Sequence, residues 1–300
     1  MNNWLLFVFN PASGKGRIRR GYLKAVFVFV KNGWDVTVHT TKAPEDAFRY
    51  IKEWGADYNL IVVSGGDGTL SECIHALMDM LPEQRPELGY IPTGTTNDFA
   101  SNMKMSKNIV KAAKNIMNGN TFKCDIGRFN DKNFIYIAAF GAFTDVAYDT
   151  PQESKNILGH LAYLLEGVKR LSGLKTCHIK VKYDGGQTEG DYIYGMVSNT
   201  NYLGGFKAEK AFAAQLNDGL FEVVLVKCPK NFQELHNLLA HLAQQNLSSD
   251  AFTVVRTNKV KFISEEEIRW TLDGEFGGAY TESDVVAEKE AVTFVVGKRM

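Results

Sequence analysis

The sequence has few cysteines, no long apolar run and no excess of charge of either sign. The four cysteines among its 300 residues, Cys73, Cys124, Cys177 and Cys228, form no CxxC pair. A chain of this length needs no disulfides, so we expect free thiols in a reducing compartment. No segment approaches the ~20 apolar residues of a membrane-spanning helix. The first residues also lack the basic segment of a signal peptide. We therefore expect a cytoplasmic protein without a transmembrane segment.

The balance of charge argues against two further classes of protein, nucleic-acid binders and proteins that bind anionic membranes by bulk charge. The chain has 34 Lys and Arg against 34 Asp and Glu. A dedicated nucleic-acid binder carries a basic surplus, and attraction to anionic membranes by bulk charge needs one too. His236 and His241 are five residues apart and do not share a helix face, so they predict no metal site. We expect no nucleic-acid partner.

What the sequence does contain is ordinary globular composition, with 45% hydrophobic and 23% charged residues. Its length suggests about two domains. In the first third, strand patterns at 4–9, 34–40, 60–63 and 88–91 alternate with helical patterns at about 44–54, 70–80 and 106–117. Such alternation indicates a parallel, doubly wound sheet.

Residues 23–30 fit two structures. Phe27 to Val30 favour a strand by propensity. Leu23, Val26, Phe27 and Val30, however, have the i, i+3, i+4, i+7 spacing of a helix. We predict a helix, because a strand–turn–helix–strand order then follows.

Beyond about residue 120 the pattern changes to strands. We expect them at 121–128, 133–140, 176–183, 190–198, 220–226, 253–263 and 268–273, with helices at about 154–171 and 231–245. The predicted fold class is therefore α/β. An N-terminal domain with a doubly wound parallel sheet (1–124, with 285–300 as a candidate final part) precedes a β-rich, sandwich-like domain (125–284).

Glycine- or proline-rich turns follow three of the expected parallel strands, at 10–16, 64–69 and 92–98. Ligands of such sheets bind at the carboxyl ends of the strands. In Gly65-Gly66-Asp67-Gly68-Thr69, the glycines let backbone N–H groups approach a phosphate, and a helix N-terminus follows. Asp67 is suited to Mg²⁺, which prefers oxygen ligands. The alternative is a plain glycine turn with Asp67 as a helix cap. The neighbouring turns favour the phosphate site.

A second glycine turn is basic. Gly14-Lys15-Gly16-Arg17 is followed by Arg19 and Arg20, but the spacing is not that of a Walker A loop. Positive charge at a helix start is mildly unfavourable, which favours an anionic ligand over a merely solvated basic helix start. Lys15 is the stronger candidate among these residues.

Two acidic segments remain ambiguous from the residues alone. Asp273-Gly274-Glu275 could supply a general base or hold a metal, yet it is also a common turn sequence. The segment 215–220 could bind a cation through oxygen atoms, but an Asn-Asp-Gly hairpin turn is the simpler interpretation.

These motifs, in this order along the chain, resemble those of a known enzyme family. The segments Asn10-Pro-Ala-Ser-Gly14, Gly65-Gly-Asp-Gly-Thr69, Gly94-Thr-Thr-Asn-Asp98 and Asp273-Gly-Glu275 resemble those of the diacylglycerol kinase catalytic-domain family, nearest to the bacterial soluble, YegS-like lipid kinases. The resemblance covers essentially the whole chain. The GGDGT motif is shared with NAD kinases and phosphofructokinases, whereas the first and third motifs together are more specific. The family implies a nucleotide-binding domain and a β-rich domain, with the active site in the cleft between them.

The positions of this sequence that match the family's motifs imply a set of site residues. The ATP site would comprise Asn10, Pro11, Ala12, Ser13, Gly14, Lys15, Thr41, Gly65, Gly66, Asp67, Gly68, Thr69, Glu72 and Thr95. Gln215, Asp218 and the carbonyl of Leu220 would hold a structural Mg²⁺. Glu275 would accept a proton, with Asp273 beside it, and Asp67 would act in catalysis. His160 stands where family members often carry a lysine, and it is not assigned a catalytic role.

The resulting hypothesis is an ATP- and Mg²⁺-dependent lipid kinase. It would phosphorylate the hydroxyl of diacylglycerol or a related lipid, giving phosphatidic acid or an analogue, during transient contact with a membrane surface. One alternative is an NAD kinase-like phosphotransferase, because of the shared GGDGT. Another is a non-catalytic nucleotide- or lipid-binding regulator. Family members can be dimers, so a homodimer stays open beside a monomer.

Overall fold

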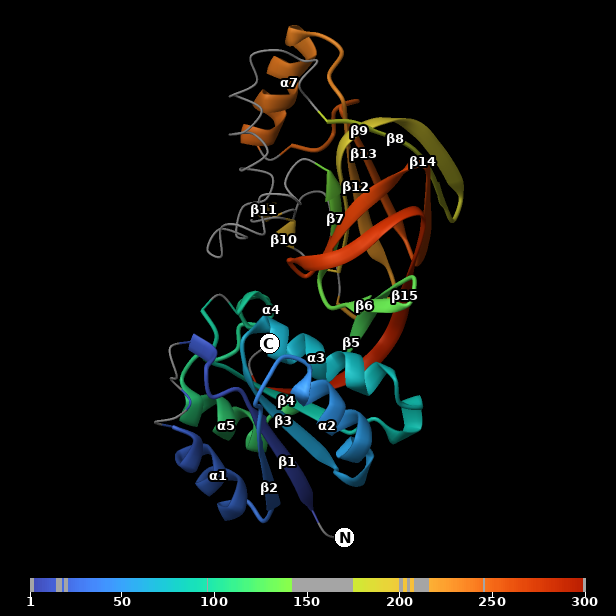
Figure 1. Ribbon diagram of the computed structural model, residues 1–300. Coiled ribbons are helices and arrows are strands. Elements are labelled where there is room, and N and C mark those ends of the chain that lie inside the picture. The colour runs from blue at the N-terminus through green and yellow to red at the C-terminus, as the bar shows by residue number, and fades with distance from the viewer. Residues whose placement is uncertain are drawn as a thin grey trace. The chain divides into compact units, whose positions relative to one another are not determined.

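The chain forms two compact units in the computed structural model (Figure 1). The first comprises Met1–Cys124 and Glu290–Met300, and the second comprises Asp125–Lys289. The structure describes residues 3–14, 18, 21–95, 97–141, 175–199, 202–203, 206–207, 216–244 and 246–298. The expected helix at 154–171, together with Lys15, Arg17, Arg19, Arg20, His160 and Gln215, lies outside the described residues.

A parallel sheet forms the centre of the first unit. Its strands, in spatial order, are β2 (Asp35–Thr40), β1 (Trp4–Phe9), β3 (Leu60–Gly65), β4 (Glu87–Pro92) and the end of β15 (Glu275–Val296). Every residue of β3 is buried. Strands covered on both faces need apolar residues on both, so they appear in the sequence as short apolar runs. The fold class predicted for this half is confirmed.

Helices cover both faces of that sheet. Helices α1 and α5 lie side by side on one face, and α2 and α3 pack together on the other (Figure 1). Their bounds are α1 Tyr22–Lys31, α2 Asp46–Trp54, α3 Asp67–Met78 and α5 Ile109–Asn118, with a short α4 at Asp98–Asn102 and 3-10 turns at Gly55–Asp57 and Pro82–Gln84. The helix predicted over 23–30 is confirmed. Helix α3 begins at Asp67, three residues before the predicted start, with Gly66 as its N-cap.

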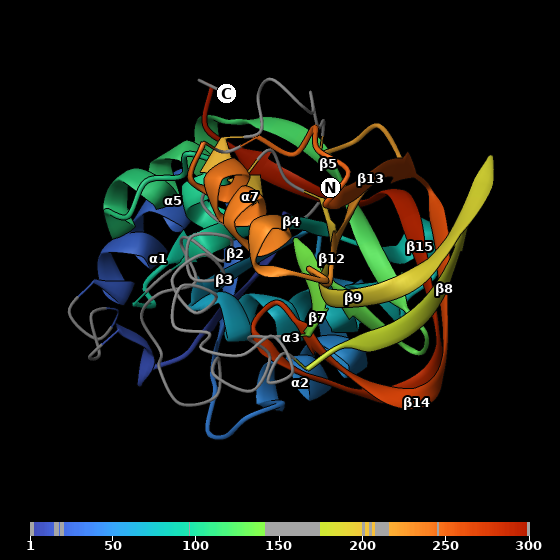
Figure 2. The same ribbon diagram turned by 90° about the horizontal axis from the view of Figure 1, so that it is seen from above.

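The second unit is built mainly from antiparallel strands. Its sheet has the order β13–β12–β9–β7–β14–β15, while β8 pairs with both β9 and β14, and β5 pairs with β6. Figure 2 shows β8, β9 and β14 as long ribbons running side by side. The bounds are β5 Asn120–Phe129, β6 Lys132–Phe134, β7 Ile137–Gly141, β8 Cys177–Tyr183, β9 Gly186–Ser198, β12 Phe221–Lys227, β13 Phe252–Thr257 and β14 Lys259–Leu272. A separate pair joins β10 (Tyr202–Leu203) to β11 (Phe206–Lys207), and α7 spans Phe232–Ala243.

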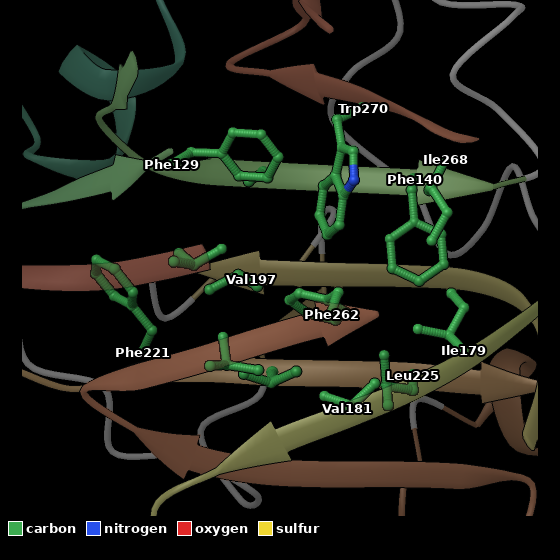
Figure 3. Close-up of a cluster of buried hydrophobic side chains, with 14 of the residues drawn as sticks. Phe129, Phe140, Ile179, Val181, Val197, Phe221, Leu225, Phe262, Ile268 and Trp270 are labelled. Carbon is green, nitrogen blue, oxygen red and sulfur yellow. The ribbon is translucent and has the colours of Figure 1, made fainter. Parts of the chain in front are cut away.

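An aromatic core holds this second unit together. Trp270 is fully buried, and its ring lies 4.8 Å from the centroids of both Phe129 and Phe140 and 4.9 Å from that of Phe262 (Figure 3). Tilted and edge-on aromatic pairs at these distances add to the stabilisation from buried area. Because its partners come from β5, β7 and β14, Trp270 joins segments that are far apart in the sequence.

Candidate active site

Three loops meet at the carboxyl ends of β1, β3 and β4 in the first unit. A Cβ atom on Gly14 would lie 1.7 Å from the carbonyl oxygen of Thr93, and one on Gly94 would lie 2.5 Å from the Cα of Gly66. Gly14 also has a φ of +55°, in the left-handed region that side chains disfavour. Only glycine fits these positions, so the predicted motifs bring three backbones into contact.

Hydrogen bonds tie these loops together. The backbone N–H of Asn10 donates to the Ser64 carbonyl at 2.9 Å, and its side-chain amide donates to the Thr69 hydroxyl at 3.4 Å. The N–H of Thr93 donates to the Gly65 carbonyl at 2.9 Å. The first and third motifs are thereby both anchored to the GGDGT loop.

Asp67 occupies the first turn of α3, beside these loops. One of its carboxylate oxygens accepts the N–H of Phe99, in α4, at 3.4 Å. No side-chain hydrogen bond caps α3 within the described part of the chain. A helix N-terminus presents backbone N–H groups and a partial positive charge, which suit a phosphate. The structure therefore places a helix N-terminus and the Asp67 carboxylate beside the three converging loops.

Asn97 organises the loop that carries Thr95. It is buried, with a φ of +55°, and its side chain exchanges two hydrogen bonds with the backbone of Gly94, at 2.9 and 2.7 Å. The Tyr90 hydroxyl donates to the same amide oxygen at 3.3 Å. Thr95, in contrast, is exposed. Asn97 was not predicted as a site residue of its own, although its position between Thr95-Thr96 and the start of α4 could have indicated a structural role.

Thr41 and Glu72 border the loop that precedes α2. Thr41 is buried, and its N–H donates to the carbonyl of Phe9 at 3.0 Å. The Glu72 carboxylate accepts the N–H groups of Glu45 and Ala47, at 2.9 and 3.2 Å. Glu72 thus holds the start of α2, where backbone N–H groups lack partners within the helix.

In the second unit, Asp273 and Glu275 differ in their surroundings. The Asp273 carboxylate accepts the backbone N–H groups of Ile135, Tyr136 and Ile137, at 2.6, 3.0 and 3.0 Å. Its backbone is left-handed, with a φ of +51°. Glu275 is the first residue of β15 and is exposed. Asp273 therefore fixes the segment before β7, whereas the Glu275 carboxylate is open to solvent.

The turn at 216–220 is held by two acidic residues. The carboxylate of buried Asp125 accepts the Gly219 N–H at 2.6 Å. One oxygen of Asp218 accepts the Leu220 N–H at 2.9 Å, and the other contacts the guanidinium of Arg256. Arg256 also donates to Glu222 at 3.1 Å. Burial of the Glu222 carboxylate raises its pKa to about 7.

These contacts affect whether the turn can bind the Mg²⁺ ion that the sequence predicted there. Both Asp218 oxygens are engaged, and Arg256 already supplies a positive charge beside them. The described residues include no group of three or more His, Cys, Asp or Glu side chains arranged for a metal. The predicted ligands are instead one carboxylate with an amide and a carbonyl oxygen. Gln215 lies outside the described residues, and a cation at Asp218 and Leu220 would share the Asp218 carboxylate with Arg256. Sequence reasoning did not find Arg256, which is 38 residues from Asp218.

Comparison with known proteins identifies the family. Residues 4–129 match the diacylglycerol kinase catalytic domain, and residues 140–293 match the YegS C-terminal NAD kinase beta sandwich-like domain. The chain is 33% identical over 273 residues to a diacylglycerol kinase of Bacillus subtilis (strain 168), covering 90% of this chain and 89% of the relative. It is 31% identical over 277 residues to a diacylglycerol kinase of Staphylococcus carnosus (strain TM300), covering 90% and 88%.

A solved structure shows the same fold. A crystal structure of a diacylglycerol kinase from Bacillus anthracis str. Sterne has the same fold, with a TM-score of 0.76, 24% identity and coverage of 98% and 97% of the two chains. The chain belongs to the diacylglycerol kinase catalytic-domain family. The resemblance inferred from the motifs, and the expected class of enzyme, a lipid kinase, are confirmed.

Proposed function

We propose that this protein transfers the γ-phosphoryl group of ATP to the free hydroxyl of diacylglycerol or a closely related lipid, giving phosphatidic acid or its analogue. The observation that carries the proposal is the convergence of three glycine-containing loops with Asp67 at the N-terminus of α3. Family membership supports the lipid acceptor. The choice of diacylglycerol as the acceptor lipid belongs to the proposal.

Phosphoryl transfer depends mainly on positioning and on neutralising charge. Backbone N–H groups of Gly65 to Thr69, at the start of α3, would hold the phosphates, with the backbone of Asn10 to Gly14 lining the nucleotide. The Asp67 carboxylate would hold the Mg²⁺ that accompanies ATP, and that ion would neutralise phosphate charge when bound. Thr41 and Thr95 would border the nucleotide at the neighbouring strand ends.

In the transfer step, the lipid hydroxyl oxygen forms a bond to the γ-phosphorus while the bond to the β-bridging oxygen breaks. ADP leaves with that oxygen, and the hydroxyl proton goes to the Glu275 carboxylate. Glu275 suits this role because its carboxylate is exposed at the start of β15. Asp273 would be a positioning residue, because its carboxylate accepts three backbone N–H groups.

The test is transfer of γ-labelled phosphate from ATP into an organic-extractable product, which is then identified. Asp67→Asn should lower kcat by about 10²–10³-fold, the loss typical of removing one group that stabilises the transition state. The matched control is Asp79→Asn, at the other end of α3, where the exposed carboxylate pairs with Lys52 at 2.6 Å. Equal activity of the Asp67 variant and its control would reject the mechanism.

The acceptor is tested in the same assay. Diacylglycerol, monoacylglycerol and NAD are supplied separately, and diacylglycerol should give the highest kcat/KM. Labelled NADP without a lipid product would support the NAD kinase-like alternative instead. ATP binding without turnover on any acceptor would support a regulator. Glu275→Gln should lower kcat by about 10²–10⁴-fold with little change in KM for ATP, as loss of a general base does.

A further inference from the structure

Helix α1 carries large apolar side chains on its solvent side. Leu23, Phe27 and Val30 are 67%, 68% and 54% exposed, although Ala25, Val28 and Phe29 already provide the face that packs on the sheet. The spacing 23, 27 and 30 places the exposed residues in one stripe along the helix. Contiguous exposed apolar surface of this kind marks an interaction site more often than chance.

The stripe continues into a groove between α1 and α5, which lie side by side in Figure 1. The groove has a volume of about 600 Å³ and is lined by Leu23, Phe27, Val28 and Val110 together with Lys24, Lys31 and Lys114. All three lysines are exposed. Apolar side chains are thus bordered by positive charge along both helices.

The charge of this face is unusual for this chain. Neither α1 nor α5 contains an Asp or Glu, and no acidic residue occurs anywhere in 1–34 or 99–124, although the whole chain has equal numbers of acidic and basic residues. An apolar helix stripe with lysines beside it is the pattern of a helix that lies in the headgroup region of an anionic bilayer.

We propose that the α1–α5 face is the surface by which this protein docks on anionic membranes. Leu23, Phe27 and Val30 enter the headgroup region, while Lys24, Lys31 and Lys114 lie against lipid phosphates. The proposal rests on the proposed function, because a kinase of a bilayer lipid must work at the membrane surface. The proposed attachment is peripheral, and among the described residues no helix is long and apolar enough to cross a bilayer.

A second copy of this chain fits the same face less well. A two-fold symmetric contact would set each patch against itself, bringing the lysines of both copies together. No carboxylate on either helix would offset that repulsion. An anionic bilayer supplies the missing negative charge.

The experiment is co-sedimentation with vesicles of equal parts phosphatidylglycerol and phosphatidylcholine, with pure phosphatidylcholine vesicles in parallel. The wild type should bind the anionic vesicles more strongly, and salt should weaken that binding. Each lysine near an anionic surface is worth about fivefold in the partition coefficient, so Lys24→Glu/Lys31→Glu/Lys114→Glu should lower binding by about 100-fold or more. Leu23→Ser/Phe27→Ser should lower binding to both vesicle types.

Matched controls make the same changes elsewhere on the surface. Lys182→Glu/Lys227→Glu/Lys230→Glu reverses three exposed lysines of the second unit, and Leu81→Ser replaces a leucine that is 57% exposed. Both should bind vesicles like the wild type. Wild-type-like binding by the α1–α5 variants would overturn the proposal, as would a wild type that binds neither vesicle. If the wild type is a dimer and these variants lose the dimer but still bind vesicles, the α1–α5 face contacts a second copy of the chain. That result would also overturn the proposal.

A separate readout distinguishes this proposal from the proposed function. All variants should phosphorylate dioctanoylglycerol dispersed in detergent at the wild-type rate, since no bilayer is involved. They should be impaired only when the lipid is presented in anionic vesicles. If the wild type binds vesicles through this face but phosphorylates no lipid in either form, the proposed function fails and the docking surface stands.

Discussion

The two units present their site residues in different ways. In the first unit the backbone makes the candidate site, because Gly14 and Gly94 let three loops approach one another at the strand ends. In the second unit the acidic side chains are themselves engaged, Asp273 by backbone N–H groups and Asp218 by Arg256. A glycine motif therefore predicts the shape of a site. An acidic turn motif predicts a role only once the partners of its carboxylate are known.

The largest effect should come from the aromatic core of the second unit. Trp270→Ala removes a fully buried side chain and should lower the free energy of unfolding by about 3–5 kcal/mol. The control is Trp54→Ala, in the first unit, where the side chain is 46% exposed and the loss should be below about 1 kcal/mol. Urea unfolding measures both. Similar losses in the two variants would contradict the described burial.

The next prediction compares Asp273, in the turn before β15, with Glu275, the first residue of that strand. Asp273→Ala leaves three backbone N–H groups without their acceptor and should cost about 2–4 kcal/mol of unfolding free energy. Glu275→Gln should cost less than about 0.5 kcal/mol, because its side chain is exposed. Thermal unfolding beside the kinase assay checks this. If Glu275→Gln destabilises as much as Asp273→Ala, the division into positioning and catalytic residues is wrong.

In the first unit, Gly14→Ala should cost about 2–3 kcal/mol, since a left-handed residue with a side chain costs ~1–2 kcal/mol before any clash. The added Cβ would also meet the Thr93 carbonyl. Gly33→Ala is the matched control, with a φ of +82° and no atom within 4 Å of the added Cβ. Only the Gly14 variant should also lose ATP affinity, measured by calorimetry. Equal ATP affinities in the two variants would show that the loop carrying Gly14 does not contact the nucleotide.

The smallest effect concerns Glu72. Glu72→Gln weakens the two hydrogen bonds at the start of α2 and should cost about 1 kcal/mol of unfolding free energy. Because the carboxylate already serves the backbone, the Kd for ATP should stay within about twofold, which is ~0.4 kcal/mol. A tenfold rise in that Kd would instead indicate that Glu72 contacts the nucleotide, as the sequence predicted.

Much of the first unit could be predicted from the sequence. Strands β1, β3 and β4 are buried on both faces and therefore stand out as short apolar runs between turn residues. Helix α1 was ambiguous for a physical reason that the structure explains. Its apolar residues occur on the solvent side as well as the sheet side, so its amphipathic pattern is blurred.

The second unit was harder to predict. The sequence predicted one strand over 253–263, whereas the chain turns near 258 between β13 and β14. No strand was predicted over β15, although 285–300 was named as a candidate final part of the first domain; the 22 residues of β15 contain glycines and charges in no clean alternation. That strand is held by pairing with β14, with register shifts along its length, and with β4. Likewise, the partners of Asp273 and Asp218 come from segments that are distant in sequence, and local patterns do not encode them.

The discontinuity of the first unit affects the order in which this protein can fold. That unit needs Glu290–Met300 as well as Met1–Cys124, and the last strand pairs with β4 through Phe294 and Val295. During synthesis, β4 therefore lacks its final neighbour until the whole second unit has been made. A ribosome-bound chain ending after residue 124 would expose an unpaired strand edge, which invites association with other chains. The first unit can therefore reach its final form only after Glu290–Met300 has been translated.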